Sequence, residues 1–155
     1  MVDDRPGVIA PPPLIFAIGI GLGFLLTWLL PLPWLPVAAP IRSAIGWLLI
    51  GSGLGVAVFS LYTMHHAGTH ADPNRPTTTI VDSGPYRYTR NPIYLSMAGV
   101  DIGLGWLFAT LWLWILLVPV LLIIRFGVIA REERYLTEKF GNTYQDYQRR
   151  VRRWL

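Results

Sequence analysis

The chain has 155 residues, the length of a single domain, but 53% of them are hydrophobic and only 14% are charged, which excludes an ordinary soluble domain. The formal net charge is +4, and eight of the thirteen Lys and Arg lie between positions 125 and 153, next to apolar segments. This clustering indicates anionic membrane lipids as partners and argues against nucleic acid. Because there is no cysteine, disulfides, a thiolate nucleophile and cysteine-based metal sites are excluded.

Four apolar segments are predicted to cross the membrane as helices, at residues 14–30, 43–64, 92–108 and 111–130. They predict an all-α fold, a polytopic helical bundle in one domain over residues 1–155. The first segment carries no charge, and at about 1.5 Å per residue it spans roughly 25 Å, enough for a thin bilayer. Only Ala109 and Thr110 separate the last two segments, so we expect a tight helical hairpin. Pro119 is expected to kink the fourth helix.

Small residues at helix-packing spacing occur in the first two segments. Gly19 and Gly23 form a GxxxG pair in the first, and Gly51 and Gly55 repeat the spacing in the second. A nucleotide-binding GxGxxG loop is the weaker interpretation, because no strand precedes the glycines and Phe24 occupies the place of the last one. The pattern therefore predicts close contact between the first two helices.

Three histidines, His65, His66 and His70, follow the second segment. A histidine pair four residues apart on a continuous helix can bind a metal, but Gly68 interrupts the pattern and no third strong ligand is nearby in sequence. We therefore expect no metal site, and interpret the histidines as polar residues that end a membrane helix at the headgroups.

A polar and aromatic stretch, GPYRYTRNPIY at residues 84–94, lies between the two hydrophobic halves. Its Gly-Pro opening prevents a helix from continuing through it, and Pro92 pushes Asn91 toward an extended conformation before the next helix begins. The free backbone N–H groups at that helix start, with Arg87 and Arg90 beside them, suit an anionic or carboxylate-bearing ligand. The alternative is a basic loop that its tyrosines hold at the lipid surface.

One charged residue, Asp101, lies inside the third segment. A carboxylate is costly at that depth unless it faces the bundle or lies near the far interface. We expect Asp101 to hydrogen-bond a neighbouring helix, and contact with a substrate is the alternative.

The fourth helix is predicted to continue into water as REERYLTEKF and to stop at Gly141, which gives the bundle a C-terminal cytoplasmic helical extension. In the tail beyond it, Tyr144, Tyr147, Val151 and Trp154 recur at spacings of 3, 4 and 3. This amphipathic face is suited to lying on the bilayer with the arginines at the headgroups.

The number of spans places both termini and the loop between the second and third spans on one side of the membrane. That side carries Arg75, Arg87, Arg90 and the basic tail, whereas the opposite connections carry only Arg42. By the positive-inside rule the first side is cytoplasmic. The stretches GPYRYTRNPIY and REERYLTEKFG therefore lie on one surface and can form one site.

Charged residues of the fourth helix are candidates to complete that site. In a straight α-helix, Arg125 and Glu132 are two turns apart on nearly the same face, about 10 Å along the axis, which suits the two ends of a polar ligand. Glu133 points about 100° away, toward a neighbouring face. The alternative is a solvated charged helix with local ion pairs.

Together, GPYRYTRNPIY and the later EERYLTEKFGNTYQDYQRRVRRWL resemble the integral-membrane methyltransferases of the isoprenylcysteine carboxyl methyltransferase family, which share a C-terminal region with phospholipid N-methyltransferases. The likeness covers roughly residues 70–155. It implies a helical membrane fold and an S-adenosylmethionine cofactor, held between the loop and acidic residues of the last helix. It also implies a hydrophobic methyl acceptor that enters from the lipid.

Transferred residue by residue, the resemblance implies a cofactor site within residues 78–94 and 125–155. The lining residues would be Ile80, Val81, Tyr86, Arg90, Asn91, Pro92, Ile93, Tyr94 and Glu132. Asn91 stands where the family usually has a histidine, so it can hydrogen-bond but cannot titrate. The substrate-facing arginine of the eukaryotic members falls on Val128 here, and Arg125 is the candidate substitute.

Methyl transfer from a sulfonium is an in-line displacement that depends mainly on positioning and on the exclusion of water. A carboxylate or thiolate acceptor needs no base, whereas an ammonium acceptor must lose a proton, and Tyr94 and Glu133 are the nearest titratable candidates. We therefore expect a membrane methyltransferase that acts on a small lipophilic or lipid acceptor. The alternatives are a non-catalytic scaffold that binds anionic lipids and a small transporter, for which Asp101 and Arg125 are too few polar residues.

Overall fold

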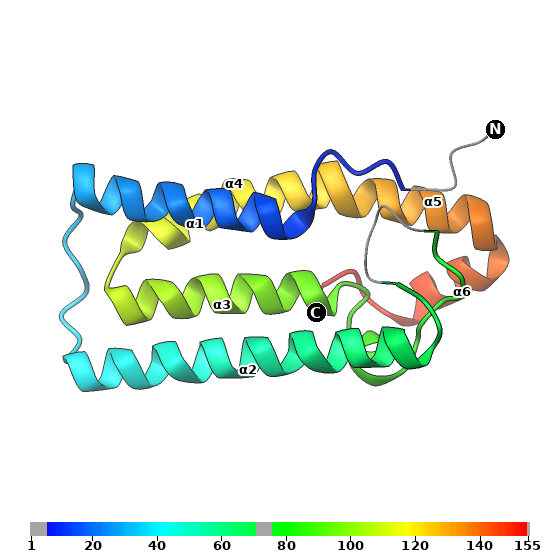
Figure 1. The fold of residues 1–155 in the computed structure, drawn as a ribbon, viewed down its shortest axis with the longest axis horizontal. Helices are drawn as coiled ribbons and strands as arrows, with labels where there is room; N and C mark the ends of the chain where they lie inside the picture. Colours follow the sequence, from blue (N-terminus) through cyan, green and yellow to red (C-terminus); the bar gives the residue numbers. More distant parts are fainter. Residues whose placement is uncertain (1–5, 71–75, 155) are drawn as a thin grey trace.

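The computed structural model describes residues 6–70 and 76–154. Within these ranges the chain is helical and contains no strand (Figure 1). In chain order the elements are α1 (Pro12–Leu29), α2 (Ala39–His66), the 3-10 helix η1 (Gly84–Arg87), α3 (Pro92–Phe108), α4 (Leu111–Ile123), the π-helical η2 (Ile124–Ile129), α5 (Ala130–Phe140) and α6 (Asn142–Arg150). The predicted all-α fold is confirmed for these residues.

Prolines and residues with positive φ set several helix boundaries. Pro12 begins α1, at a position where a helix does not need its N–H, and the helix ends at Leu29, shortly before Pro31. Ala109 adopts a left-handed conformation with φ of 52° between α3 and α4, so the predicted tight hairpin is confirmed. Gly141, with φ of 54°, ends α5 where the sequence predicted a stop.

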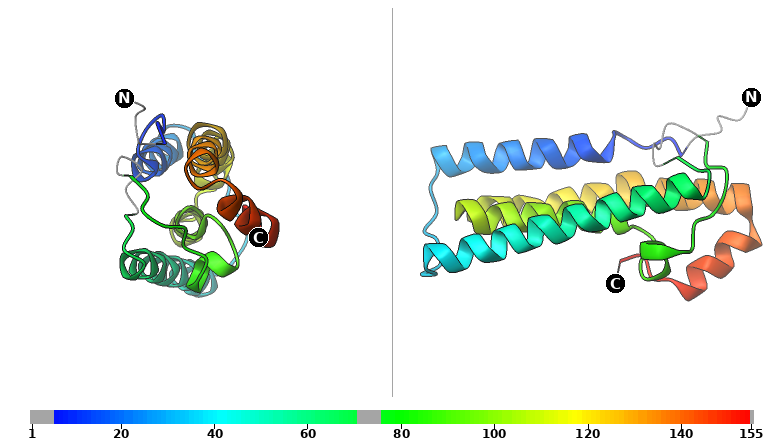
Figure 2. Two further views of the ribbon diagram at one scale, coloured as in Figure 1. Left: turned by 90° about the vertical axis from the view of Figure 1, so that its right-hand side faces the viewer. Right: turned by 60° about the horizontal axis from the view of Figure 1, so that its bottom comes forward.

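The long helices pack as two neighbouring pairs, α1 beside α4 and α2 beside α3, and α3 also contacts α4 (Figures 1 and 2). Glycines allow the close approach in both pairs. A Cβ added at Gly19 of α1 would lie 2.6 Å from the Val120 side chain of α4. A Cβ added at Gly46 of α2 would lie 2.9 Å from the backbone oxygen of Gly103 in α3.

The predicted close contact between the first two helices is therefore wrong. Among the described residues, nothing lies within 4 Å of a Cβ added at Gly51 or Gly55, so these glycines face away from any partner helix. Gly19 and Gly23 do mark a close helix contact, but the partner is α4. Small-residue spacing identifies a face that can approach a neighbour and does not identify the neighbour.

Three helices of the described chain are long and apolar enough to cross a membrane: α1, α2 and the continuous helix Leu111–Phe140. The chain exposes large apolar side chains along these helices, as a lipid-embedded bundle does. They include Leu14, Ile18, Leu22 and Trp28 of α1, Trp47, Leu48 and Val58 of α2, and Val118, Leu122 and Phe126 of the third. The helix α3 is apolar but shorter, so the fourth span stays a prediction.

The two ends of the bundle differ. One end holds the connection between α1 and α2 and the turn between α3 and α4 (Figure 1). There Trp34, Trp106 and Trp114 form an aromatic cluster, with ring centroids 5.2 to 5.7 Å apart. The opposite end holds η1, α5, α6 and the start of α3 (Figure 1). Arg75, which contributes to the predicted charge difference between the ends, lies outside the described residues.

The last long helix is irregular, as Pro119 led us to expect, but the irregularity lies beyond the proline. Pro119 is inside α4, and the six-residue π-helical η2 follows at Ile124–Ile129. A π-helix has more residues per turn than an α-helix, so it changes which side chains share a face. Ile124, Val128 and Ile129 are fully buried in the bundle core.

Asp101 is 1% exposed and faces the interior of the bundle, one of the two places that the sequence allowed for a charged residue in α3. Its Oδ1 atom makes no hydrogen bond to any described residue. The predicted hydrogen bond to a neighbouring helix is therefore not found at this atom.

The predicted membrane-facing side of the C-terminal tail is wrong. Tyr144, Tyr147 and Val151 are 3%, 4% and 8% exposed, and they pack with Ile80 and other apolar residues of the protein. The turn at Gly141 folds α6 back, so its apolar face covers the chain and not the bilayer (Figure 1). Amphipathic spacing predicts burial of that face but cannot distinguish protein from lipid as the cover.

Candidate functional site

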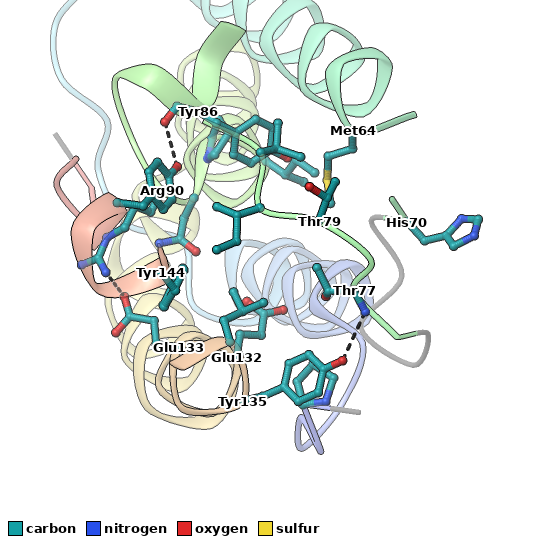
Figure 3. Close-up of a pocket in the computed structure, with 18 of the residues that line it drawn as sticks. Met64, His70, Thr77, Thr79, Tyr86, Arg90, Glu132, Glu133, Tyr135 and Tyr144 are labelled. Carbon is teal, nitrogen blue, oxygen red and sulfur yellow. Dashed lines mark hydrogen bonds and ion pairs between the residues drawn. The ribbon is translucent and has the colours of Figure 1, made fainter. Parts of the chain in front are cut away.

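A pocket lies at the end of the bundle where η1, α5 and α6 meet. The segment 77–81, η1, the start of α3, and α5 and α6 form its walls, and the end of α2 borders it (Figure 3). Its volume is about 140 Å³, enough for a ligand larger than a water molecule or a single ion. The lining residues are Pro6, Met64, His70, Thr77, Thr79, Ile80, Val81, Tyr86, Arg90, Asn91, Pro92, Ile93, Tyr94, Glu132, Glu133, Tyr135, Leu136, Tyr144 and Tyr147.

The GPYRYTRNPIY stretch supplies one wall because its backbone turns twice. Gly84 has φ of 56°, and a Cβ there would lie 2.8 Å from Thr63 Oγ1 of α2, so the turn sits close against that helix. The short η1 then buries Tyr86. Asn91 leaves the helical region with ψ of 54°, and α3 begins at Pro92, as predicted. These turns direct residues 86–94 toward α5.

Tyr94 and Glu132 meet inside the pocket. The Tyr94 hydroxyl of α3 donates a 2.7 Å hydrogen bond to Glu132 Oε1 of α5. Thirty-eight positions separate the two residues in sequence, so the contact joins the two stretches that the sequence predicted would form one site. It gives the pocket a carboxylate whose orientation is fixed by a phenol.

The neighbouring Glu133 is held by two arginines. Its Oε1 lies 3.1 Å from Arg90 Nη1, and Arg153 Nε and Nη2 donate hydrogen bonds of 3.0 and 2.5 Å to its two oxygens. The hydrogen bond to Glu133 raises the pKa of Arg153. Figure 3 shows Arg90 and Glu133 together on the side of the pocket opposite to Met64 and His70. Glu133 thus links the loop, α5 and the C-terminal segment.

Backbone contacts fix the C-terminal segment against the same loop. The Asn91 side-chain amide donates a 2.9 Å hydrogen bond to the Arg153 carbonyl, and the Arg90 N–H donates one of 2.9 Å to the Arg152 carbonyl. The Tyr147 hydroxyl donates to the Tyr86 carbonyl at 2.8 Å. Asn91 therefore positions the C-terminal segment through a hydrogen bond. This role does not require a side chain that titrates.

Buried phenols surround the cavity. Burial raises the pKa of Tyr144 to about 12, the charge of Glu133 adds to the rise, and Arg90 opposes it. Burial also raises the pKa of Tyr86 and of Tyr147. These hydroxyls stay protonated at neutral pH, so they serve as hydrogen-bond donors and as aromatic surface.

Ten of the eleven predicted site residues line this one pocket. They are Ile80, Val81, Tyr86, Arg90, Asn91, Pro92, Ile93, Tyr94, Glu132 and Glu133. Arg125 is exposed, lies 5.3 Å from the Phe126 ring, and is not among the lining residues. Arg125 lies inside η2, and the α-helical spacing from which we predicted that it shares a face with Glu132 does not hold through a π-helix.

Sequence reasoning missed the other lining residues. Tyr144 and Tyr147 were recognised as one face of α6, and the Gly141 stop was a signal that this face returns to the protein. Thr77 and Tyr135 carried no signal, although the Thr77 N–H donates a 3.2 Å hydrogen bond to the Tyr135 hydroxyl across the cavity wall. His70 lies at the border of the pocket, and its ring points away from the other labelled side chains (Figure 3).

The histidines after the second segment end a helix, as expected. His65 and His66 lie in the last turn of α2, and His70 lies beyond it. Within the described residues, no group of three or more His, Cys, Asp or Glu side chains is arranged to hold a metal ion.

Comparison with known proteins gives the family. An uncharacterized protein from Haemophilus influenzae is 44% identical over 68 aligned residues, and the match covers 41% of this chain and all of that protein. No solved structure matches the chain. The sequence profile of the phospholipid methyltransferase family matches residues 41–143, from the start of α2 to the start of α6. The chain therefore belongs to the phospholipid methyltransferase family, as the resemblance in GPYRYTRNPIY and the last helix predicted.

Proposed function

We propose that this membrane methyltransferase uses S-adenosylmethionine to methylate a small lipophilic or lipid acceptor at the cytoplasmic face of the membrane. The observation that carries the proposal is the convergence of residues 80–94 with Glu132 and Glu133 on one pocket. The family membership supports the reaction class. The exposed apolar helices support an acceptor that reaches the site from lipid.

The residues of the pocket fit such a cofactor. Arg90 has buried donor atoms without a hydrogen-bond acceptor among the described residues, and Glu132 offers a carboxylate for a cationic group. The rings of Tyr86, Tyr144 and Tyr147 offer aromatic surface for a base or for a positive charge. The cofactor, when bound, supplies a methyl group on a positively charged sulfur.

The protein contributes by positioning the methyl donor and the acceptor and by excluding water from the pocket. Tyr94 fixes the Glu132 carboxylate, while α6 and the C-terminal segment close one side of the pocket. Both oxygens of Glu133 are occupied by arginine donors, so we assign it to positioning and no longer to proton transfer. If the acceptor is an ammonium group, Glu132 with Tyr94 remains the pair that can take its proton.

We further propose that all four long helices cross the membrane, with both termini in the cytoplasm. The antiparallel packing of α3 between its neighbours and its apolar sequence support the fourth span. Among the described residues, the end that carries the pocket also carries Arg87, Arg90 and the arginines of α5 and α6, whereas Arg42 lies at the other end.

Binding of S-adenosylmethionine to the purified protein in detergent tests the proposal. We expect saturable binding, with affinity lowered about tenfold or more by Glu132→Gln, which removes the negative charge, and by Tyr94→Phe, which removes the hydrogen bond that orients the Glu132 carboxylate. Glu138→Gln, an exposed carboxylate on α5, is the matched control and should leave the affinity unchanged. Absence of saturable binding, with affinity only for anionic liposomes, would instead favour a non-catalytic lipid-binding scaffold.

A labelled-methyl transfer assay then identifies the acceptor class. The acceptors to compare are a membrane lipid extract and a panel of hydrophobic thiols, amines and carboxylic acids. Transfer to amines only would assign a proton-accepting role to the Tyr94–Glu132 pair, and transfer to carboxylic acids or thiols would need none.

A further inference from the structure

The segment that leads into α1 lies along the last long helix (Figure 1). We call residues 6–10 the N-terminal strap. The Ile9 N–H donates a 3.3 Å hydrogen bond to the Gly127 carbonyl of η2. Arg131 Nη1 of α5 donates one of 2.7 Å to the Gly7 carbonyl. The strap therefore joins the start of the described chain to the helix that carries one wall of the pocket.

The π-helical η2 is shaped to receive the strap. A Cβ added at Gly127 would collide with the Ile9 side chain, so a larger residue at position 127 would push the strap away. The change from α-helical to π-helical hydrogen bonding also alters the pairing of backbone carbonyls, and the Gly127 carbonyl accepts a hydrogen bond from the strap. The strap thus gives η2 a structural role that the pocket residues alone do not explain.

The strap forms one edge of the pocket. Pro6, which precedes α1, and Met64, near the end of α2, both line the pocket. Val8 and Ala10 pack against the buried cluster that contains Val128. The helices α1 and α2 do not form one of the packed helix pairs of the described chain. The strap therefore closes the pocket at an edge where two neighbouring helices do not pack together.

The strap is held less firmly than the helices. None of its residues is fully buried, and both Gly7 and Arg131, which share a hydrogen bond, are exposed. Release of the strap therefore requires less free energy than separation of two long helices. Ile9 is 51% exposed, and Leu14 at the start of α1 is exposed to the same degree, so the outer side of the strap is suited to contact with lipid.

We propose that the N-terminal strap is a lid that opens to admit the methyl acceptor from the lipid and closes over the pocket for transfer, with η2 as the surface that holds it closed. This inference rests on the proposed function and deepens it, because it names the element through which the acceptor reaches the site. The closed strap excludes water at the edge that Pro6 forms.

A reversible disulfide between the strap and η2 tests whether the strap must open. The chain has no cysteine of its own. A Cβ at Gly127 would lie 2.9 Å from Ile9 Cγ1 and 3.6 Å from Ile9 Cγ2, so the two Cβ atoms come within the separation that a disulfide spans. In Ile9→Cys with Gly127→Cys, oxidation should slow labelled-methyl transfer to a membrane lipid extract about tenfold or more, and reduction should restore the rate.

A second disulfide is the matched control. A Cβ at Gly19 of α1 would lie 3.9 Å from Val120 Cβ of α4, so Gly19→Cys with Val120→Cys crosslinks the bundle and leaves the strap free. Its oxidation should leave the rate of transfer unchanged. Binding of S-adenosylmethionine should be the same in the oxidised and reduced forms of both double variants, because the strap admits the acceptor and not the donor.

Labelling of Val8→Cys gives a measurement that does not depend on the reaction. In this background Gly127→Ala and Arg131→Gln should each raise the rate of reaction with a maleimide about tenfold, because each removes one contact of the strap. Gly99→Ala and Arg134→Gln are the controls and should leave the rate unchanged. A Cβ at Gly99 meets no described atom within 4 Å, and Arg134 is exposed.

The outcomes separate this inference from the proposed function. Transfer at an unchanged rate with the Ile9–Gly127 disulfide formed would overturn the opening of the strap, and loss of S-adenosylmethionine binding in that form would overturn its role as a lid for the acceptor. Unchanged labelling in both Gly127→Ala and Arg131→Gln would overturn the role of η2. Absence of methyl transfer by the unmodified protein would remove the proposed function, and labelling of Val8→Cys would still decide whether the strap opens.

Discussion

Two adjacent glutamates of α5 have different surroundings and therefore different tasks. Glu132 receives one hydrogen bond from a neutral phenol, whereas Glu133 is engaged by two guanidinium groups. The sequence offered both as charged residues of one helix turn and could not distinguish them. The arginines that pair with Glu133 and not with Glu132 come from positions 90 and 153. The difference between the two glutamates therefore depends on contacts that form only in the folded chain.

The buried hydroxyl of Tyr147 gives a test of how the loop is held. Tyr147→Phe removes the hydrogen bond to the Tyr86 carbonyl and leaves that buried acceptor without its partner. We expect the free energy of unfolding to fall by about 1 to 2 kcal/mol, measured by thermal unfolding in detergent. Tyr88→Phe, on a side chain that is 74% exposed, is the control. Equal shifts for the two variants would mean that the hydrogen bond does not stabilise the loop.

At the scale of elements, the glycine faces of α2 separate a packed side from a free side. Gly53 faces α3, where an added Cβ would lie 2.9 Å from the Ser96 carbonyl oxygen, and Gly51 faces open space among the described residues. We expect Gly53→Ala to lower the free energy of unfolding by about 1 to 3 kcal/mol, because two helix backbones must move apart. Gly51→Ala should be neutral or slightly stabilising.

Thermal unfolding of the two variants in the same detergent measures this difference. Gly46→Ala is a second case on the packed side, since its Cβ would lie 2.9 Å from the Gly103 carbonyl oxygen. A stability loss for Gly51→Ala as large as that for Gly53→Ala would contradict the assigned α2–α3 contact.

Helix boundaries were the most predictable part of the fold. Pro92 and the Ala109-Thr110 connection fixed both ends of α3, and Gly141 fixed the end of α5, because each signal acts through the local backbone. Which helices pair was not predictable, since Gly19 and Gly51 have the same spacing but only Gly19 contacts a partner. A packing partner is a property of the whole chain.

In the candidate site as well, some residues could be predicted from the sequence and others depend on the fold of the whole chain. Residues of the loop and Glu132 were predicted together because a family resemblance links the two stretches, and they line one pocket. Arg125 was assigned from α-helical geometry, and η2 breaks that geometry. Thr77 and Tyr135 belong to no recognised motif. They meet at the cavity because the fold brings together residues that are far apart in sequence.

At the scale of the whole molecule, the bundle has one end with little besides turns and one end with the pocket (Figure 1). The absence of cysteine in the sequence makes this polarity easy to test. Single cysteines at Ser83 and Glu138 should react with a membrane-impermeant maleimide from the cytoplasmic side only. Cysteines at Leu32 and Phe108 should react from the opposite side only.

Labelling of intact cells and of inverted vesicles gives the two arms of this experiment. The proposed four spans require Phe108 and Ser83, which flank α3, to react from different sides. Reaction of both cysteines from the same side would remove the fourth span while leaving the other three.

The π-helical η2 also bears on how this sequence is compared with its relatives. It joins the membrane part of the last helix to the part that carries Glu132 and Glu133. A π-helical turn accommodates one more residue than an α-helical turn, so loss of one residue within η2 would convert it to α-helix and keep the facing of α5. A one-residue gap in a relative at this place would therefore leave the same carboxylate of α5 facing the pocket, so alignments across η2 should be judged by the geometry of α5 and not by identity alone.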